Sequence, residues 1–425
     1  MTTAVKQGGW KWRKIKLTKV TTKIGSGATP HGGKSAYKKS GISLIRSLNV
    51  FDLKLKKKGL AFIGEAQAKN LSNVIVEEND ILLNITGASV CRCAIMSDDI
   101  LPARVNQHVA IVRADKKKLS PKFLLYSLVL GYNKQRLLGI ASNGATREAL
   151  TKSDIENFEI TIPSLPAQQK IASALSAFDD LIAINERRIQ VLEETAWLIY
   201  HEWFVKFRFP GYKKTRFIES RTKFGKIPKG WEVKPFSELV EINPTIKTIK
   251  SEPHFFVAMD GVSTGSFVKI GGEKIVKNGR RFANKDVLFA RITPCLENGK
   301  GGYVILDKES QNEIIFGSTE FIIFREKLLP SEFIYLLSRD RDFRKNAEKS
   351  MVGASGRQRV QDSCFNSFFV PLPSQNLLAN FTQATSPLFE NIYNLERENQ
   401  SLRQARDLLL PRLIGGEIKV GNLNF

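Results

Sequence analysis

The order of apolar and polar residues divides the chain into two kinds of region that alternate. Runs rich in β-branched and aromatic residues, broken by Gly, Asn and Asp, fill two stretches of about 150 residues and predict short β-strands. The runs are GISLIRSLNV, NVIVEENDILLNI and HVAIVRA in the first stretch, and FFVAMDGV, DVLFARI, GYVILD and EFIIFRE in the second. Each stretch also contains a segment that we expect to be helical, residues 121–131 in the first and 330–338 in the second. The pattern therefore indicates two strand-rich domains.

A helical period follows each strand-rich stretch. Pro166 suits the first turn of a helix, and apolar residues then recur at spacings of four and three, which is the stripe of a coiled coil. Each stripe holds one Asn, which either fixes the register by hydrogen bonding across the pair or lies at a solvent-facing edge. We expect two long helices that pair antiparallel, with a seam made of Leu175, Phe178, Ile182, Asn185, Ile189, Leu192, Leu388, Ile392, Leu395, Asn399 and Leu402.

The dipeptide Ser386-Pro387 complicates the second helical stretch. Proline lacks the N–H of an internal helical hydrogen bond, and its ring clashes with the preceding turn. We expect Ser386 to be an N-cap or a kink and the second long helix to begin there. The first helix, with about 38 residues, should extend roughly 57 Å and act as a ruler.

Self-comparison shows two copies of one unit. At a constant offset of 210, Arg147 matches Arg357, Ser153 matches Ser363 and Phe158 matches Phe368. Further upstream, NDILLNITG resembles NKDVLFARIT. The expected fold class is α+β, with a pseudo-two-fold internal repeat. The expected boundaries are residues 8–163 and 211–372 for the strand-rich domains, and 164–210 and 373–417 for the helical spacers.

Charge adds a partner to this picture. The chain of 425 residues has 65 Lys and Arg against 42 Asp and Glu, a formal net charge of +23. Such an excess repels itself unless a polyanion or an acidic partner relieves it, and nucleic acid is the leading candidate. A ribosome-like or merely alkaline protein that has no specific site is the less favoured alternative from charge alone.

The cysteines and the N-terminal segment indicate the cellular compartment in which the protein folds. The four cysteines, Cys91, Cys93, Cys295 and Cys364, form neither a disulfide framework nor a zinc-ligand spacing, so we expect no metal site. The N-terminal segment lacks the apolar core of a signal peptide, and no run is long enough to span a bilayer. We therefore expect a soluble, cytoplasmic protein.

These features together resemble a known family. Two variable strand-rich regions are each followed by a helix start such as PSLPAQQKIASAL, and the segments WFVKFRFPG, GKIPKGWEV and LLLPRLIGGEI complete the pattern over nearly the whole chain. The chain resembles the DNA specificity subunit of type I restriction-modification systems. The second helix start, PSQNLLANF, is more degenerate than the first.

The resemblance implies a division of labour. Two target recognition domains would each read one half of a bipartite, asymmetric DNA sequence, held apart by the paired helices. Two modification (methyltransferase) subunits and the restriction (translocase and endonuclease) subunits would be the protein partners. S-adenosylmethionine, ATP and Mg²⁺ would then be bound by those subunits, for adenine-N6 methylation and cleavage in phage defence, and not by this chain.

Catalytic motifs are missing or incomplete. The chain has no Pro-Pro pair, which the flipped-base motif of an adenine methyltransferase requires. Residues 28–35, ATPHGGKS, fit a phosphate loop only permissively, and that motif needs a strand before it and a helix after it. His201-Glu202 begins a zinc-peptidase pattern, but Val205 stands where the second His is needed. We expect no catalytic residue, and a Gly-rich loop of this kind is better suited to a DNA phosphate.

Base reading calls for Arg or Lys opposite guanine and for Asn or Gln opposite adenine, carried on loops or strands. The lysine runs 54–58 and 116–118 are better suited to phosphate contacts or to plain solvation. The candidate DNA-binding residues are Lys34, Tyr37, Arg46, Ser47, Asn49, Arg92, Asn106, Gln107 and Arg147 in the first domain, and Ser263, Thr264, Arg291, Thr293, Arg357, Gln358 and Arg359 in the second.

Two other functions remain open from the sequence. A stand-alone DNA-modifying enzyme would turn over by itself with a methyl donor or magnesium. A structural RNA-binding protein would fit the charge but not the heptads or the duplication.

Overall fold

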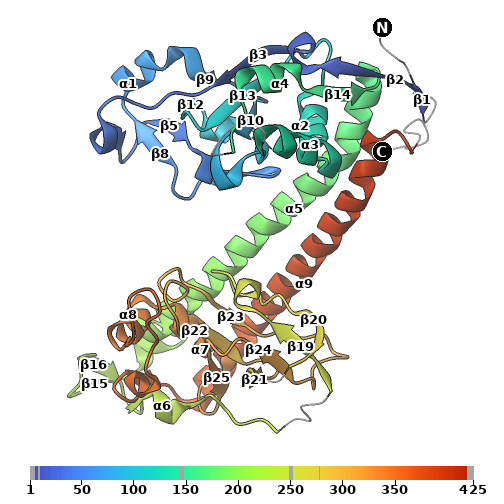
Figure 1. Ribbon diagram of the computed structural model, residues 1–425. Coiled ribbons are helices and arrows are strands. Elements are labelled where there is room, and N and C mark those ends of the chain that lie inside the picture. Colours follow the sequence, from blue (N-terminus) through green and yellow to red (C-terminus); the bar gives the residue numbers. More distant parts are fainter. Residues whose placement is uncertain (1–4, 8–9, 143–147, 248–251, 277, 419–425) are drawn as a thin grey trace. The chain divides into compact units, whose positions relative to one another are not determined.

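The computed structural model describes residues 5–7, 10–142, 148–247, 252–276 and 278–418 (Figure 1). The chain divides into two compact units, each of which is described by itself. Unit 1 contains residues 1–182 together with 401–425, and unit 2 contains residues 183–400. Within the described ranges, no helix combines the length and the apolar content needed to cross a bilayer.

Unit 1 is built on antiparallel and mixed sheets. Its four-stranded sheet has the order β11 (Cys93–Ile95), β10 (Ile81–Asn84), β13 (Val109–Ala114) and β3 (Thr21–Ser26). Its five-stranded sheet has the order β4 (Tyr37–Lys38), β8 (Ala61–Ile63), β5 (Ile42–Ile45), β12 (Ala103–Val105) and β9 (Ile75–Val76), with β5 and β12 parallel. The smaller sheets are β1 (Val5–Gln7), β2 (Trp10–Lys16) and β14 (Glu159–Ile162), and the hairpin β6 (Val50–Phe51) and β7 (Lys54–Leu55).

Unit 2 repeats this topology. Its first four-stranded sheet, β23 (Gly301–Tyr303), β22 (Val287–Ala290), β25 (Phe321–Glu326) and β18 (Val240–Ile242), corresponds strand by strand to β11, β10, β13 and β3. The second sheet has the order β20 (Gly271–Ile275), β19 (Pro253–Val257), β24 (Ile315–Gly317) and β21 (Arg280–Phe282), with β19 and β24 parallel. Two pairs complete the unit, β17 (Glu232–Pro235) with β26 (Phe369–Leu372), and β15 (Phe217–Glu219) with β16 (Lys226–Pro228). The internal repeat predicted from the sequence is therefore confirmed.

Two of the short helices occur in matching places, α2 with α7 and α3 with α8. Unit 1 contains α1 (Glu65–Asn70), α2 (Pro121–Val129), α3 (Gly131–Ser142) and α4 (Lys152–Asn157), and unit 2 contains α6 (Phe236–Leu239), α7 (Ser331–Arg339) and α8 (Arg341–Lys349). The predicted helices at 121–131 and 330–338 are confirmed as α2 and α7. Ser120 caps α2 ahead of a proline in its first turn, and the Asp340 side chain caps α8 by accepting from two backbone N–H groups.

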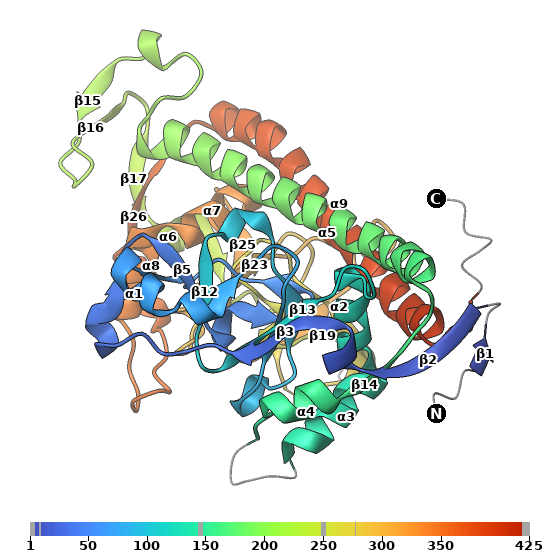
Figure 2. The same cartoon turned by 90° about the horizontal axis from the view of Figure 1, so that it is seen from above.

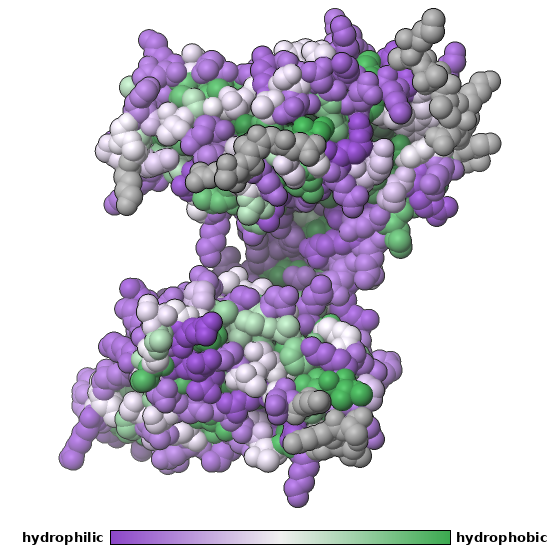
Figure 3. Space-filling model, viewed as in Figure 1, coloured by the Kyte–Doolittle hydropathy of each residue, from purple (hydrophilic) through white to green (hydrophobic). Residues whose placement is uncertain are grey.

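Each unit has two apolar layers, because the strands of its four-stranded sheet are buried on both faces. In unit 1, Leu82 and Ile111 face the five-stranded sheet, whereas Ile81 and Val112 face α2 and the long helices. Unit 2 has the same arrangement, with Leu288 on the inter-sheet side and Phe289 on the helix side. In Figure 3 the visible surface is mostly hydrophilic, with apolar residues in small patches.

The long helices α5 (Leu165–Tyr200) and α9 (Gln375–Ile414) pair antiparallel (Figures 1 and 2). In unit 1 the first half of α5 shares a core with the last turns of α9, through Leu175 and Leu413. In unit 2 the second half of α5 shares a core with the first turns of α9, through Ile189 and Phe381. This opposite order of contacts confirms the predicted antiparallel pair.

The expectation that the second long helix begins or kinks at Ser386 is wrong, because α9 continues without a break from Gln375 through Pro387. Phe381 and Phe389, on either side of the proline, are fully buried in the same core. Burial of one large apolar side chain contributes about 1.5–3 kcal/mol, which together offsets the roughly 3 kcal/mol cost of an internal proline. Gln383, whose carbonyl loses its partner, is exposed, so water can satisfy that oxygen.

The two seam asparagines lie in the core and not at a solvent-facing edge. Asn185 is 1% and Asn399 is 0% exposed, and both belong to unit 2. Counted from the ring contact between Trp203 and Phe381, with an equal rise per residue along both helices, Asn185 is level with Asn399. Among the residues that the structure describes, Nδ2 of Asn185 and Nδ2 of Asn399 donate to no hydrogen-bond acceptor. Oδ1 of Asn399 likewise accepts from no donor there.

Candidate nucleic-acid interface

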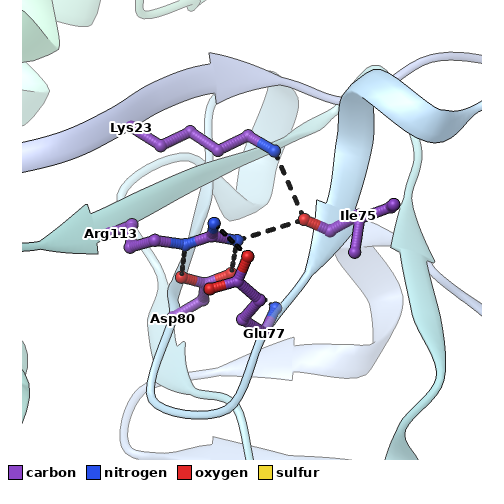
Figure 4. Close-up of polar contacts among 5 residues, drawn as sticks. All are labelled: Lys23, Ile75, Glu77, Asp80 and Arg113. Carbon is purple, nitrogen blue, oxygen red and sulfur yellow. Dashed lines mark hydrogen bonds and ion pairs between the residues drawn. The ribbon is translucent and has the colours of Figure 1, made fainter.

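An ion pair joins the start of β10 to the end of β13 in the four-stranded sheet of unit 1 (Figure 4). Asp80 is 1% exposed and accepts hydrogen bonds from Arg113 Nε at 2.7 Å and Nη2 at 2.8 Å. The backbone N–H of Glu77 donates to the same carboxylate at 2.7 Å. Arg113 and Lys23 both donate to the carbonyl of Ile75, and burial together with the Arg113 charge lowers the pKa of Lys23.

Unit 2 contains the same device at the equivalent strands. Asp286, also 1% exposed, accepts from Arg325 Nε at 2.8 Å and Nη2 at 2.6 Å, and from the Ala283 backbone N–H at 2.7 Å. Sequence reasoning missed both pairs. The signal that could have found them is the Asp that precedes an apolar run in each copy, matched by an Arg after HVAIV and EFIIF.

Arg46 and Ser47 lie where β5 ends in unit 1, beside Tyr37. The Arg46 guanidinium lies 5.8 Å from the centre of the Tyr37 ring, and its Nη2 donates to the carbonyl of Gly59 at 2.8 Å. The carbonyl of Ser47 accepts from Asn84 Nδ2 at 3.0 Å, which ties this loop to the end of β10. Tyr37 is 37% exposed, so the structure places a cation and an aromatic ring together at the surface.

A second cation–aromatic group adjoins this one. Lys56 Nζ lies 3.8 Å and the Arg92 guanidinium 5.1 Å from the centre of the Phe51 ring. Lys56 belongs to the lysine run that the sequence assigned to phosphate contacts or solvation. Two cations on one half-buried ring make a site suited to a phosphate or to a base edge.

Asn49 is a correction to the set of candidate base readers. It is 1% exposed, its Oδ1 accepts from the Arg46 backbone N–H at 3.1 Å, and its Nδ2 donates to the carbonyl of Lys56 at 3.0 Å. An amide that is buried and engaged at both ends holds the turn and does not face solvent. We therefore assign Asn49 to the support of the loop.

Asn106 and Gln107 precede β13 and lie next to the Arg46 loop. Asn106 is 8% exposed, its backbone N–H donates to the carbonyl of Ile45 at 3.0 Å, and its Oδ1 accepts from the His108 backbone N–H at 3.2 Å. Gln107 is exposed, and its Nε2 lies 3.0 Å from His108 Nε2, while His108 Nδ1 lies 2.6 Å from Thr86 Oγ1. Gln107 is thus the member of this pair that faces solvent.

In unit 2, Arg291, Thr293 and Gln358 come together from two loops. The Thr293 and Gln358 segments exchange two hydrogen bonds of 3.1 Å, from Thr293 N–H to the Gln358 carbonyl and from Gln358 N–H to Thr293 Oγ1. Arg291 Nη2 donates to the carbonyl of Val360 at 3.2 Å. Thr293 is 8% exposed, so its hydroxyl serves the loop, whereas the side chains of Arg291 and Gln358 are half-buried.

The two remaining candidate arginines of unit 2, Arg357 and Arg359, differ in their surroundings. Arg359 donates to both oxygens of Glu320 in a bidentate pair, from Nε at 3.0–3.1 Å and from Nη2 at 2.7 Å. Arg357 is exposed. Arg359 must release Glu320 before it can bind a base in bidentate geometry, so Arg357 is the more available cation.

Ser263 and Thr264 form an exposed loop of unit 2 whose backbone is tied down. Arg339 of α7 donates to the carbonyls of Thr264 and, at 2.8 Å, of Gly299. The Gly301 backbone N–H donates to the carbonyl of Ser263 at 3.2 Å. Ser263 Oγ accepts from the Gly265 backbone N–H at 3.1 Å, so the loop presents its two exposed side chains from a fixed backbone.

Two candidate residues have no described side chain. Arg147 lies outside the described residues, and of Lys34 the structure describes the backbone alone. Lys34 itself falls in a single 3₁₀ turn, Gly33–Ala36, that leads directly into β4. A nucleotide-binding phosphate loop needs a helix at this point, so the phosphate-loop interpretation fails.

The cysteines give no nucleophile in unit 1. Burial raises the pKa of the Cys91 thiol to about 12 and also raises the pKa of Cys93. Over the ranges that the structure describes, no three His, Cys, Asp or Glu side chains are grouped to hold a metal ion.

The seam residues predicted from the sequence divide by depth. Leu175, Ile182, Asn185, Ile189, Ile392, Leu395 and Asn399 are buried, and Phe178, Leu192, Leu388 and Leu402 are half-buried.

A second apolar stripe, missed by sequence reasoning, runs along the solvent side of α5 in unit 2. Ile184, Val191 and Leu198 follow one another at intervals of seven and are 56%, 45% and 53% exposed. Val205, 44% exposed, continues the same spacing in the π-helical turn His201–Val205. An exposed apolar row of this kind is typical of a surface that binds another protein.

Comparison with known proteins identifies relatives of this arrangement. Residues 11–194 match the family model described as the type I restriction modification DNA specificity domain. The chain is 27% identical over 310 residues to the type I restriction enzyme MjaIX specificity subunit of Methanocaldococcus jannaschii, covering 70% of this chain and 69% of the relative. It is 26% identical over 373 residues to the MjaVIII specificity subunit of the same organism, covering 83% and 82%.

A solved structure has the same fold. The S subunit of a type I restriction-modification system from M. genitalium superposes with a TM-score of 0.57, at 15% identity, over 97% of this chain and 99% of that chain. The fold class expected from the sequence is confirmed, and the matching family model and relatives are of the kind that the sequence resemblance named.

Proposed function

Because this chain belongs to the family of DNA specificity subunits of type I restriction-modification systems, we propose that it reads a bipartite, asymmetric DNA target. Each strand-rich domain contacts one half-site, residues 8–163 the first and 211–372 the second. The observation that carries this proposal is that equivalent loops differ in their side chains. The loop after β10 carries Arg92, whereas the loop after β22 carries Arg291 and Thr293. One backbone plan with two sets of side chains suits two unlike half-sites.

The paired helices set the distance between the half-sites in this proposal. An α-helix extends by about 1.5 Å per residue, so removing one heptad from α5 and one from α9 would shorten the pair by about 10 Å. Counted from the ring contact between Trp203 and Phe381, with an equal rise per residue, residues 183–189 correspond to 395–401. This deletion spares Asp179, which is bonded to Tyr126 and Arg406 in unit 1, and Ile392, which is buried in unit 2.

The modification subunits supply the chemistry. We place their docking surface on the exposed stripe of α5, Ile184, Val191 and Leu198. S-adenosylmethionine, ATP and Mg²⁺ are then bound by the modification and restriction subunits, and this chain binds none of them.

Genome-wide mapping of adenine methylation tests the proposal, with the chain co-expressed with its modification subunits. Replacing residues 8–163 by the first domain of another family member should change one half-site and leave the other half-site and the spacer unchanged. The double heptad deletion should keep both half-sites and shorten the spacer by about three base pairs, at 3.4 Å per pair. Altered half-sites with an unchanged spacer would contradict the ruler, and methylation that ignores the chain would overturn the whole proposal.

A further inference from the structure

The exposed loop of unit 2 that carries Ser263 and Thr264 is held on the long helix α5 by one carboxylate. Glu193 Oε1 accepts a hydrogen bond from the Ser266 backbone N–H at 2.6 Å and another from Ser266 Oγ at 2.9 Å. Ser266 is 4% exposed, so both bonds are sheltered from water. Gly265 passes so close that a Cβ there would lie 3.2 Å from the same oxygen.

The loop is fixed to the rest of unit 2 on the remaining sides. Arg339 of α7 donates to the carbonyl of Thr264, and the carbonyl of Ser266 accepts from the Tyr303 backbone N–H at 2.8 Å. The Phe267 ring lies 5.9 Å from the Tyr393 ring of α9. Ser266 and its neighbours are therefore tied to three helices, while Ser263 and Thr264 keep exposed side chains.

The charge of Glu193 supports a positioning role. A carboxylate behind a DNA-reading loop repels phosphate and weakens the binding of DNA. Its two charge-assisted hydrogen bonds provide a structural reason for its presence, because such bonds are shorter and stronger than neutral ones. The residue 210 positions later is Arg403, a cation, so unit 1 has no carboxylate at the matching place on α9.

We propose that Glu193 is a positioning residue for DNA reading: it fixes the 263–266 loop on α5 so that Ser263 and Thr264 meet the second half-site in one register. This inference rests on the proposed function and deepens it. The helix that sets the spacing of the half-sites then also sets the orientation of one reading loop.

The test compares Glu193→Ala, Glu193→Gln and the control Glu194→Ala, whose side chain is exposed one residue further on. Each full-length variant is co-expressed with the modification subunits, and methylation is mapped for each half-site. Glu193→Ala should reduce discrimination at bases of the second half-site by roughly tenfold, the scale of one lost base contact, and leave the first half-site unchanged. Glu193→Gln keeps the accepting oxygen and should restore most of the discrimination, and Glu194→Ala should match the unaltered chain.

The outcomes separate the inference from its premise. If Glu193→Ala leaves base discrimination unchanged at both half-sites, the positioning role is overturned while the bipartite reading stands. Equal loss at both half-sites, together with a lower melting temperature, would make Glu193 a residue of general stability and would also overturn it. If the unaltered chain directs methylation to no bipartite site, the proposed function itself fails.

Discussion

Units 1 and 2 share strand order and buried Asp–Arg pairs but differ in the side chains that lie between their short helices and the long helices. In unit 1 the junction is an apolar core, with Phe123, Ile171 and Ile414, that also contains a polar group. Asp179 of α5 accepts from the hydroxyl of Tyr126 in α2 and from Arg406 of α9. Burial and the Asp179 charge raise the pKa of Tyr126 far above its usual value, so the hydroxyl remains a donor at all physiological pH values.

In unit 2 the rings of Phe333, Phe381 and Phe204 take the places of Phe123, Ile171 and Ile414, so this part of the junction is aromatic. Phe204 packs against Phe333 of α7 and Phe381 of α9 with ring centres 4.8 and 4.9 Å apart, and Tyr200 meets Phe333 at 5.2 Å. Such ring pairs combine large buried area with a preferred edge-on geometry. The two copies therefore keep the strand order of their sheets, whereas the side chains that join those sheets to the long helices differ.

The largest effect should come from the aromatic junction. Phe381→Ala removes a fully buried ring and should lower the free energy of unfolding of unit 2 by about 3–5 kcal/mol. Hydrogen exchange, read separately for the amides of each unit, should show lost protection in unit 2 and unchanged protection in the strands of unit 1. Phe369→Ala, at a ring that is 43% exposed, is the matched control. Equal loss in both units would show that their stabilities are not separate.

Loss of the equivalent Asp–Arg ion pair should destabilise the two units by similar amounts. Asp80→Ala and Asp286→Ala each leave a partly buried arginine without its partner, which should cost about 3 kcal/mol. The arginine side chains are 21% and 28% exposed, which places the effect at the lower end of the range for buried pairs. Urea unfolding monitored by hydrogen exchange measures both. A difference of more than about 1.4 kcal/mol, tenfold in the unfolding equilibrium, would contradict the equivalence of the two sheets.

The smallest effect should come from the polar group at the junction of unit 1. Arg406→Gln should destabilise unit 1 by about 1 kcal/mol at low salt, because one charge-assisted bond is lost while Tyr126 continues to donate to Asp179. The Arg406 and Asp179 side chains are only 12% and 25% exposed, so the loss should change little when the salt concentration rises to about 1 M, because partly buried pairs are screened much less than exposed ones. Asp180→Asn, with a side chain that is 69% exposed, is the control. A loss that disappears at high salt would contradict a sheltered contact.

The sequence predicted those features that repeat or have a period. Strands, the helices α2 and α7, the long antiparallel pair and the duplication all follow from local patterns that the structure confirms. The course of α9 was predicted wrongly, since the proline at position 387 is a local signal whereas the burial of Phe381 and Phe389 is a tertiary one. Asn49 was misassigned for the same reason, because a residue type says nothing about whether its amide is already engaged.

The helix-to-loop contact at Glu193 lay beyond sequence reasoning altogether. It joins positions 73 residues apart, and neither Glu193 nor Ser266 belongs to a motif. The exposed stripe at Ile184, Val191 and Leu198 could have been found, because it has a heptad period of its own beside that of the seam. The base-reading residues stay predictions, because the chemistry of an exposed Arg or Gln is the same whether it meets DNA or water.

The discontinuity of unit 1 has a consequence for biosynthesis. Its core includes Leu410, Leu413 and Ile414 beside Trp12 and Leu17, whereas unit 2 is one continuous segment of chain. A ribosome makes the first domain before the second, yet the apolar face that awaits the end of α9 stays uncovered until residues 401–414 emerge. Unit 2 can thus complete its core first, although its synthesis starts later, and the nascent first domain depends on chaperones or on its own partial packing for as long as it takes to translate more than 200 further residues.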